Sequence, residues 1–171
     1  MKKTILKLAF ILPCFVFANE LEFKTLKSNF VQTVTSDGSK IEYSGNFMTT
    51  HNNAFWHYKS PTVKNIYFNY ERVAIIEPDL EQVIYTSLTN VPNLIDVIKS
   101  ATKVSKDTYQ AELDTITYTL TLKDGLMSEI SYKDRLDNDV VIKFSDVRKN
   151  EYIDDSLLLP VYPKEYDVVV Q

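Results

Sequence analysis

Apolar and polar residues alternate along much of this chain, which is the pattern of β-strands with one buried face. In the clearest stretch, residues 115–122, the apolar side chains of Ile116, Tyr118, Leu120 and Leu122 alternate with threonines. The β-branched threonines suit the more exposed face of a strand. We therefore predict a strand here with one apolar and one polar face.

The same pattern recurs in short stretches separated by turn signals. Asp124-Gly125 is a typical hairpin turn, and Asp137-Asn138 and Pro78 mark two others. The further predicted strands are residues 41–47, 56–59, 63–68, 73–76, 82–86, 126–132, 140–144 and 168–170. About ten short strands of this kind predict an antiparallel sheet with one apolar and one polar face.

Two segments have helical spacing. Residues 20–29 could form a short helix with Leu21, Leu26 and Phe30 on roughly one side. The second predicted helix covers residues 91–99 and has Pro92 near its start. A sheet with one apolar face must be covered. Two or three short helices cannot fill the concavity of such a sheet tightly, so part of that face is expected to remain as a cavity.

Residues 1–18 have the pattern of a secretory signal peptide. A lysine-rich start and an apolar run from Leu8 to Phe17 precede the small Ala18, which predicts cleavage after Ala18. The apolar run is too short to span a bilayer stably. The alternatives are an uncleaved anchor and a lipoprotein signal at Cys14, although Pro13 stands where the lipoprotein signal needs a small residue.

Composition excludes several classes of function for the mature domain, residues 19–171. Cys14 is the only cysteine, so the mature chain can form neither a disulfide nor a thiolate site. Loss of three lysines with the signal reduces the 19 basic residues to 16, against 23 acidic ones, which changes the net charge from −4 to −7. This charge argues against nucleic acid or an anionic membrane surface as the main partner. The length suits a single domain.

Candidate chemical groups are few. His51 and His57 are the only histidines, and they would share one face of a continuous strand, but no carboxylate has the spacing to complete a metal site. Glu77, Asp79 and Glu81 could suggest a glycosidase pair. They bracket a proline turn, where acidic residues are common. We predict no catalytic residue, no metal and no cofactor.

Several short segments together resemble the periplasmic outer-membrane lipoprotein carrier family, the LolA type. The family patterns are F-x-Q, S-G-x-F, W-x-Y-x-x-P, Y-x-P-x-L-x-Q-V, N-T-P before a lid helix, and a closing N-x-x-x and P-x-G-x-D-V. The matching segments, in chain order, are Phe30-Val31-Gln32, Ser44-Gly45-Asn46-Phe47, Trp56 to Pro61, Ile76 to Val83, Asn90-Val91-Pro92, Asn150, and Leu159-Pro160 to Val168. The resemblance covers nearly all of the mature chain.

This resemblance implies an incomplete antiparallel β-barrel, or half-barrel, covered by an α-helical lid. It implies a monomeric chaperone, not an enzyme, that takes lipoproteins from an inner-membrane ABC transporter across the periplasm to the outer membrane. An outer-membrane acceptor is a further candidate partner. The predicted lipid-binding cavity residues are Phe47, Trp56, Tyr58, Ile66, Phe68, Ile75, Leu94, Ile95, Ile98, Ile116, Tyr118, Leu120 and Leu122.

The chain departs from the family pattern before the aromatic strand. The family usually has Arg-Pro there, and the arginine ties the sheet to the lid. Here Thr50 or His51 occupies the arginine position, so these two residues are the candidates for a weaker lid latch. The family's Asp-Gly turn is also replaced, by Asn69-Tyr70. We expect a more loosely held lid than in relatives that keep the arginine.

Two other functional classes stay open from the sequence. One is a regulatory module that senses lipid or mislocalised lipoprotein on the same half-barrel, without transport. The other is an enzyme of unfamiliar type, which the missing nucleophile and metal ligands disfavour. Bound lipoprotein would favour the carrier, whereas turnover of a substrate would favour the enzyme.

Overall fold

The computed structural model describes residues 20–69, 72–87 and 93–171. One 12-stranded sheet dominates it, in the order β12-β6-β5-β4-β3-β2-β1-β11-β10-β9-β8-β7. The strands are β1 (Leu26–Ser36), β2 (Ser39–Thr49), β3 (Ala54–Ser60), β4 (Lys64–Phe68), β5 (Val73–Glu77), β6 (Gln82–Thr86), β7 (Thr102–Ser105), β8 (Thr108–Leu113), β9 (Ile116–Lys123), β10 (Leu126–Lys133), β11 (Asp139–Lys149) and β12 (Asp167–Val170). The helical elements are η1 (Pro78–Leu80), α1 (Leu94–Ser100) and η3 (Asp155–Leu158).

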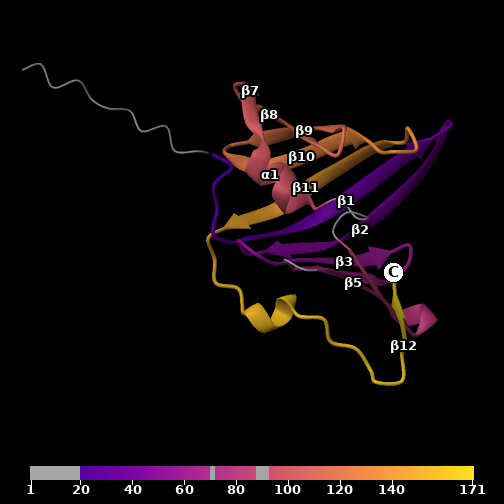
Figure 1. Cartoon of the computed structure of the whole chain (residues 1–171). Helices are drawn as coiled ribbons and strands as arrows, with labels where there is room; N and C mark the ends of the chain where they lie inside the picture. The colour runs from indigo at the N-terminus through magenta and orange to yellow at the C-terminus, as the bar shows by residue number, and fades with distance from the viewer. Residues whose placement is uncertain (1–19, 70–71, 88–92) are drawn as a thin grey trace, which may run out of the picture.

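The sheet curves without closing, and helix α1 lies within the curve (Figure 1). Strands β7 and β12 form its two free edges. This architecture confirms the predicted mainly β half-barrel, with one α-helix as the lid in the described residues. The expectation of a wholly antiparallel sheet is wrong at one edge, because β12 pairs with β6 in parallel. None of the described helices is long and apolar enough to cross a membrane.

The predicted helix over residues 20–29 is wrong. Strand β1 begins at Leu26, and Leu26, Ser28 and Phe30 are buried on one face of it. Leu26 and Phe30 are four residues apart, a spacing that places side chains on one face of a helix and equally on one face of a strand. Pairing with both β2 and β11 decided the outcome in favour of the strand.

Helix α1 confirms the second predicted helix over most of its length. Its N-cap is Asn93, whose side chain accepts a hydrogen bond from the backbone N–H of Ile95 at 3.1 Å. The apolar residues Leu94, Ile95, Val97 and Ile98 are all buried. The predicted signal peptide, the Asn90-Val91-Pro92 segment and Tyr70 lie outside the described residues.

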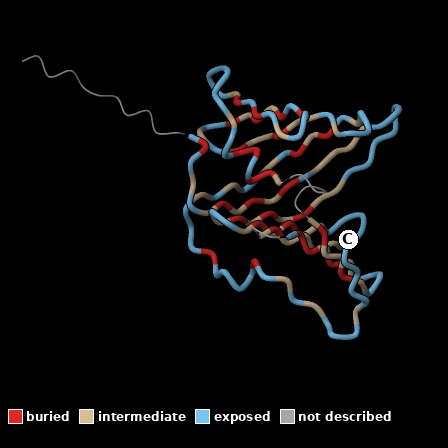
Figure 2. The backbone as a smooth tube through the Cα atoms, viewed as in Figure 1, coloured by how far each residue is buried: buried red, intermediate tan, exposed pale blue. Residues whose placement is uncertain are grey.

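The main hydrophobic core lies on the concave face of the sheet, beneath α1. Buried residues alternate mainly with half-buried ones along parts of the central strands (Figure 2). In β9 the alternation matches the prediction, since Ile116, Tyr118, Leu120 and Leu122 are buried and Thr117 is exposed. This face therefore carries the apolar surface that helix α1 covers.

A smaller apolar cluster lies on the outer face of β5 and β6. Ile76 pairs with Val83 there, and both are buried on the side opposite to Ile75. The segment after β11 passes outside the sheet before reaching β12, and its Ile153 and Leu158 are also buried (Figure 1). The sheet is thus covered on both faces over these strands, but only the concave face has a helical lid.

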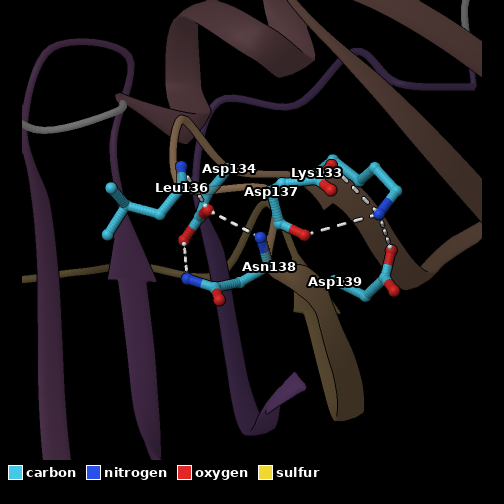
Figure 3. A network of polar contacts seen from close by, with 6 residues as sticks. All are labelled: Lys133, Asp134, Leu136, Asp137, Asn138 and Asp139. Atoms are coloured by element: carbon cyan, nitrogen blue, oxygen red, sulfur yellow. Dashed lines mark hydrogen bonds and ion pairs between the residues drawn. The ribbon is translucent and has the colours of Figure 1, made fainter. Parts of the chain in front are cut away.

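The predicted turns at Asp124-Gly125 and Asp137-Asn138 are confirmed. The second belongs to a tight β10–β11 connection in which Asp134 accepts backbone hydrogen bonds from Leu136 at 2.8 Å and Asn138 at 3.0 Å. Lys133 pairs with the carboxylates of Asp137 and Asp139, each at 3.2 Å (Figure 3). These bonds are local, so they fix the connection without taking part in the concave face.

Candidate functional site

A cavity lies between the concave face and the N-terminal end of helix α1. Its volume is about 200 Å³. The lining residues are Gln32, Trp56, Tyr58, Ile66, Phe68, Leu94, Tyr132 and Ile142. They come from strands β1, β3, β4, β10 and β11 and from α1. The cavity is therefore a gap in the contact between lid and sheet, with mostly apolar walls.

A second hollow of about 230 Å³ continues from this cavity. Gln32, Tyr58 and Ile66 line both spaces. The second hollow is otherwise lined by Val34, Tyr43, Thr62 and Lys64, and it lies towards the end of the β1–β2 hairpin. We call the first space the inner cavity and the second the mouth. Polar side chains increase from the inner cavity to the mouth.

Aromatic rings form the wall of the inner cavity on the β1–β3 side. Trp56 lies 4.3 Å from Phe47 and 4.9 Å from Phe30 between ring centroids, and Phe30 makes an edge contact with Tyr58 at 5.0 Å. Gly45 is directly opposite Phe30 on β2, where a Cβ atom would lie 2.9 Å from the Phe30 ring. The glycine therefore leaves room for the ring to lie across the neighbouring strand.

One polar pair interrupts the apolar wall. The hydroxyl of Tyr58 donates a hydrogen bond to Oε1 of Gln32 at 2.8 Å. Burial raises the pKa of Tyr58, and burial likewise raises the pKa of Tyr132 on the opposite wall. Both hydroxyls therefore keep their protons at neutral pH and can act as hydrogen-bond donors.

The C-terminal half of α1 closes against the β2–β3 turn. A third hollow, about 220 Å³, lies there and is lined in part by Thr50, His51, Ile95, Ile98 and Lys99. The ammonium group of Lys99 donates a hydrogen bond to the backbone carbonyl of His51 at 2.8 Å. A charged side chain thus joins helix α1 to the sheet, and this side chain, Lys99, belongs to the helix.

The two predicted latch candidates lie near this contact. The hydroxyl of Thr50 accepts backbone hydrogen bonds from Asn52 and Asn53, so it stabilises its own turn. His51 contributes its backbone carbonyl and has an exposed side chain. The two histidines do not lie on one continuous strand, because His51 lies in the turn and His57 lies in β3, bonded to Asn65 at 2.7 Å.

The predicted cavity residues divide into two groups. Five of them line the inner cavity: Trp56, Tyr58, Ile66, Phe68 and Leu94. The others lie in or against the packed core of the same face, or in the third hollow: Phe47, Ile75, Ile95, Ile98, Ile116, Tyr118, Leu120 and Leu122. Their role in lipid binding stays a prediction.

Sequence reasoning did not assign a role to several residues at the site. Gln32, Tyr132 and Ile142 line the inner cavity, and Lys99 bonds the sheet. Gln32 occurs in the F-x-Q segment, and it shares the concave face of β1 with Leu26 and Phe30 because the strand has a period of two. Tyr132 lies between Ser131 and Lys133 in β10, so period-two spacing could have identified it. Ile142 follows Val140 and Val141 in β11, so spacing alone does not mark it.

Two polar features lie outside the inner cavity, although Lys64 of the second also lines the mouth. A larger hollow of about 430 Å³ on the outer face is lined in part by Lys27, Asp146 and Arg148, which would not solvate hydrocarbon. Glu77 pairs with Lys64 at 2.9 Å and accepts a hydrogen bond from Gln82 at 2.6 Å. The bond from Lys64 lowers the pKa of Glu77 below its usual value, so this turn carboxylate acts as a structural ion-pair partner.

Comparison with known proteins identifies relatives of the whole chain. The family model described as outer membrane lipoprotein carrier protein LolA matches residues 22–111. A protein from Campylobacter jejuni named outer-membrane lipoprotein carrier protein is 42% identical over 169 residues, covering 99% of both sequences. A Helicobacter hepaticus protein of the same name is 30% identical over 157 residues, covering 90% of this chain and 88% of its own.

Solved structures share the fold at low sequence identity. A LolA superfamily protein from Nitrosomonas europaea aligns with a TM-score of 0.51 at 12% identity and covers 82% of this chain and 93% of its own. An uncharacterized conserved protein from Thermus thermophilus aligns with a TM-score of 0.55 at 8% identity. The alignment covers 89% of this chain and 93% of that protein. At these identities the likeness concerns the fold alone.

Proposed function

Because the chain belongs to the outer-membrane lipoprotein carrier (LolA) family, we propose that it holds lipoprotein acyl chains in the inner cavity beneath helix α1. In this proposal the protein is a periplasmic chaperone. Residues 1–18 direct its export and are removed by cleavage after Ala18. It receives cargo from an inner-membrane ABC transporter and carries it to the outer membrane or an acceptor there. It catalyses no reaction and requires no cofactor.

The apolar gap between lid and sheet supports this proposal most directly. Burying a methylene group is worth about 0.8 kcal/mol, so one long acyl chain contributes on the order of 10 kcal/mol. Trp56, Ile66 and Phe68 supply such a surface on the sheet side, and Leu94 supplies it on the lid. Such walls exclude water from an acyl chain while the net charge of the exterior keeps the complex soluble.

The lid must move for the cavity to hold more than a small part of the cargo. The inner cavity is only about 200 Å³. Movement of α1 away from the sheet would open this space towards other residues of the same core cluster, including Ile116 and Leu122. In this account the second group of predicted cavity residues becomes part of the binding surface when cargo enters.

A lipoprotein release assay tests the proposal. Purified protein is added to spheroplasts that contain the inner-membrane transporter, and lipoprotein in the soluble fraction is measured. The test variant is Ile66→Glu, since Ile66 is half-buried and lines both the inner cavity and the mouth. The matched control is Thr117→Glu, which adds the same charge at an exposed position.

We expect the wild type and Thr117→Glu to form a soluble complex with lipoprotein, and Ile66→Glu to release at least tenfold less. A carboxylate buried against the acyl chain reduces the binding free energy by more than the loss of one apolar contact does. Normal release by folded Ile66→Glu would contradict the proposed site. A complex that forms but never passes its cargo to outer-membrane vesicles would instead favour the sensing module.

A further inference from the structure

Three polar side chains lie in the wall of the inner cavity, although hydrocarbon offers them no hydrogen-bond partner. They are Gln32 on β1, Tyr58 on β3 and Tyr132 on β10. The remaining lining residues are apolar: Trp56, Ile66, Phe68, Leu94 and Ile142. Polar groups that face an apolar ligand without partners weaken its binding. Their presence therefore points to a polar part of the ligand.

The positions of these groups leave hydrogen-bond donors free for a ligand. Oε1 of Gln32 accepts the bond from Tyr58, so the amide nitrogen of Gln32 retains two N–H donors. Among the described residues, neither this nitrogen nor the Tyr132 hydroxyl has a hydrogen-bond partner in the protein. Both side chains line the inner cavity, so the free donors are available there.

The location of Gln32 also fits the end of an acyl chain. Gln32 pairs with Tyr43 on one side and with Ile142 on the other, and it lines both the inner cavity and the mouth. A ligand whose hydrocarbon occupies the inner cavity and whose peptide leaves through the mouth would therefore place its linking groups beside Gln32. In an acylated protein those groups are esters and amides. Their carbonyl oxygens are hydrogen-bond acceptors only, so they need donors in the cavity wall.

We propose that Gln32, Tyr58 and Tyr132 form a subsite for the ester and amide carbonyl groups at the head of the bound acyl chains. The Gln32 amide and the Tyr132 hydroxyl donate to the carbonyl oxygens, and Tyr58 orients the Gln32 amide through the bond to Oε1. This subsite rests on the proposed function and adds specificity to it. The cavity selects acylated ligands over molecules with alkyl chains alone.

Binding of two synthetic lipopeptides to the purified protein, measured by calorimetry, tests the subsite. The first is a triacylated lipopeptide with ester and amide linkages, and the second is an analogue with ethers in place of the esters. The ether probe is more apolar, so the informative quantity is how the ratio of the two affinities changes between variants. Gln32→Leu removes the donors, and Gln110→Leu makes the same substitution at an exposed position of β8.

We expect wild type and Gln110→Leu to bind the ester probe about tenfold more tightly than the ether probe, as two donated hydrogen bonds would allow. Gln32→Leu should bind both probes but lose about fivefold or more of this preference. Tyr132→Phe removes one hydroxyl and should leave the fold unchanged. Its preference for the ester probe should fall about threefold, which provides a second readout.

The outcomes separate this proposal from the one on which it rests. Equal affinity of the wild type for both probes would overturn the subsite and leave the acyl-chain cavity standing. An undiminished ester preference in both Gln32→Leu and Tyr132→Phe would also overturn the subsite. Failure of the wild type to bind either probe would overturn the subsite and the proposed function together.

Discussion

The ammonium nitrogen of Lys99 on helix α1 lies 2.8 Å from the backbone carbonyl oxygen of His51 in the β2–β3 turn. The family resemblance implies that an arginine of the sheet ties it to the lid, with Thr50 or His51 at that position in this chain. In this chain the cation stands on the lid and the acceptor is the main chain of the sheet. A lysine of the lid therefore bonds the turn that carries Thr50 and His51.

Replacing Lys99 with Met should make α1 open more often. The lost bond involves a charged donor, which strengthens it, but Lys99 is exposed to solvent, which weakens it. We expect backbone amides of Val97 and Ile98 to exchange hydrogen about threefold to tenfold faster. Hydrogen exchange followed by mass spectrometry measures this change.

Two control variants make the assignment of the latch specific. Lys106→Met removes a lysine from the β7–β8 turn and should leave exchange in α1 unchanged. His51→Ala should also have little effect, because Lys99 bonds the backbone carbonyl of residue 51. Faster exchange in His51→Ala with no change in Lys99→Met would show that the imidazole holds the lid.

Gly45 should be less tolerant of a side chain than Gly38. A Cβ atom at Gly45 would overlap the His57 carbonyl oxygen and approach the Phe30 ring, whereas one at Gly38 meets no atom within 4 Å. We expect Gly45→Ala to lower the free energy of unfolding by about 1–3 kcal/mol through overpacking. Gly38 has a φ of 80°, so Gly38→Ala should cost about 1 kcal/mol from the backbone alone.

Urea denaturation of the two glycine variants measures this difference. The disruption at Gly45 also concerns the site, because Phe30 contacts both Trp56 and Tyr58 in the cavity wall. Lipopeptide affinity should therefore fall in Gly45→Ala and stay unchanged in Gly38→Ala. Equal losses of stability in the two variants would mean that β2 shifts to admit the methyl group.

The ion pair between Glu77 and Lys64 should make part of the stability depend on pH. Hydrogen bonding from Lys64 lowers the Glu77 pKa from its ordinary 4.5 in the folded state. This stabilisation is present above pH 4.5 and is lost as pH falls through the lowered pKa. The pair is partly exposed, so we expect it to contribute about 0.5–1 kcal/mol to the free energy of unfolding at neutral pH.

A pH series of urea midpoints for the wild type and Glu77→Gln tests this contribution. The wild type should be the more stable protein at neutral pH, and the difference should shrink as the solution is acidified. Lys64→Met should remove most of the same difference, since it deletes the partner. A difference that stays constant down to low pH would show that packing, not charge, distinguishes Glu77 from Gln.

Periodicity alone predicted the fold well wherever a strand alternates clearly between apolar and polar residues. Strand β9 and the Asp124-Gly125 turn behave as expected, because one face of β9 is buried and the turn requires a positive φ. The helix predicted over residues 20–29 includes the start of β1, because the spacing of Leu26 and Phe30 suits either a helix or a strand. The predicted strand over residues 168–170 is confirmed as β12. Strand β7 was not predicted, because all four of its residues are exposed and no burial pattern marks them.

The site could be predicted only in part. Trp56, Ile66 and Phe68 follow from alternation, because apolar side chains of β3 and β4 must meet the lid side of the sheet. The bond between Tyr58 and Gln32 joins residues 26 positions apart, and it depends on the curvature of the sheet. The Lys99 contact depends on where the seven-residue helix comes to rest, which spacing within the helix does not specify.

The central claim is that this protein carries acylated lipoproteins with their acyl chains in the cavity beneath α1. Native mass spectrometry of protein isolated from the periplasm without detergent tests it most directly. The account predicts a complex whose added mass equals one acylated lipoprotein, present in the wild type and Thr117→Glu and lost in Ile66→Glu. Wild-type protein that carries no lipoprotein, or Ile66→Glu that carries as much as the wild type, would contradict it.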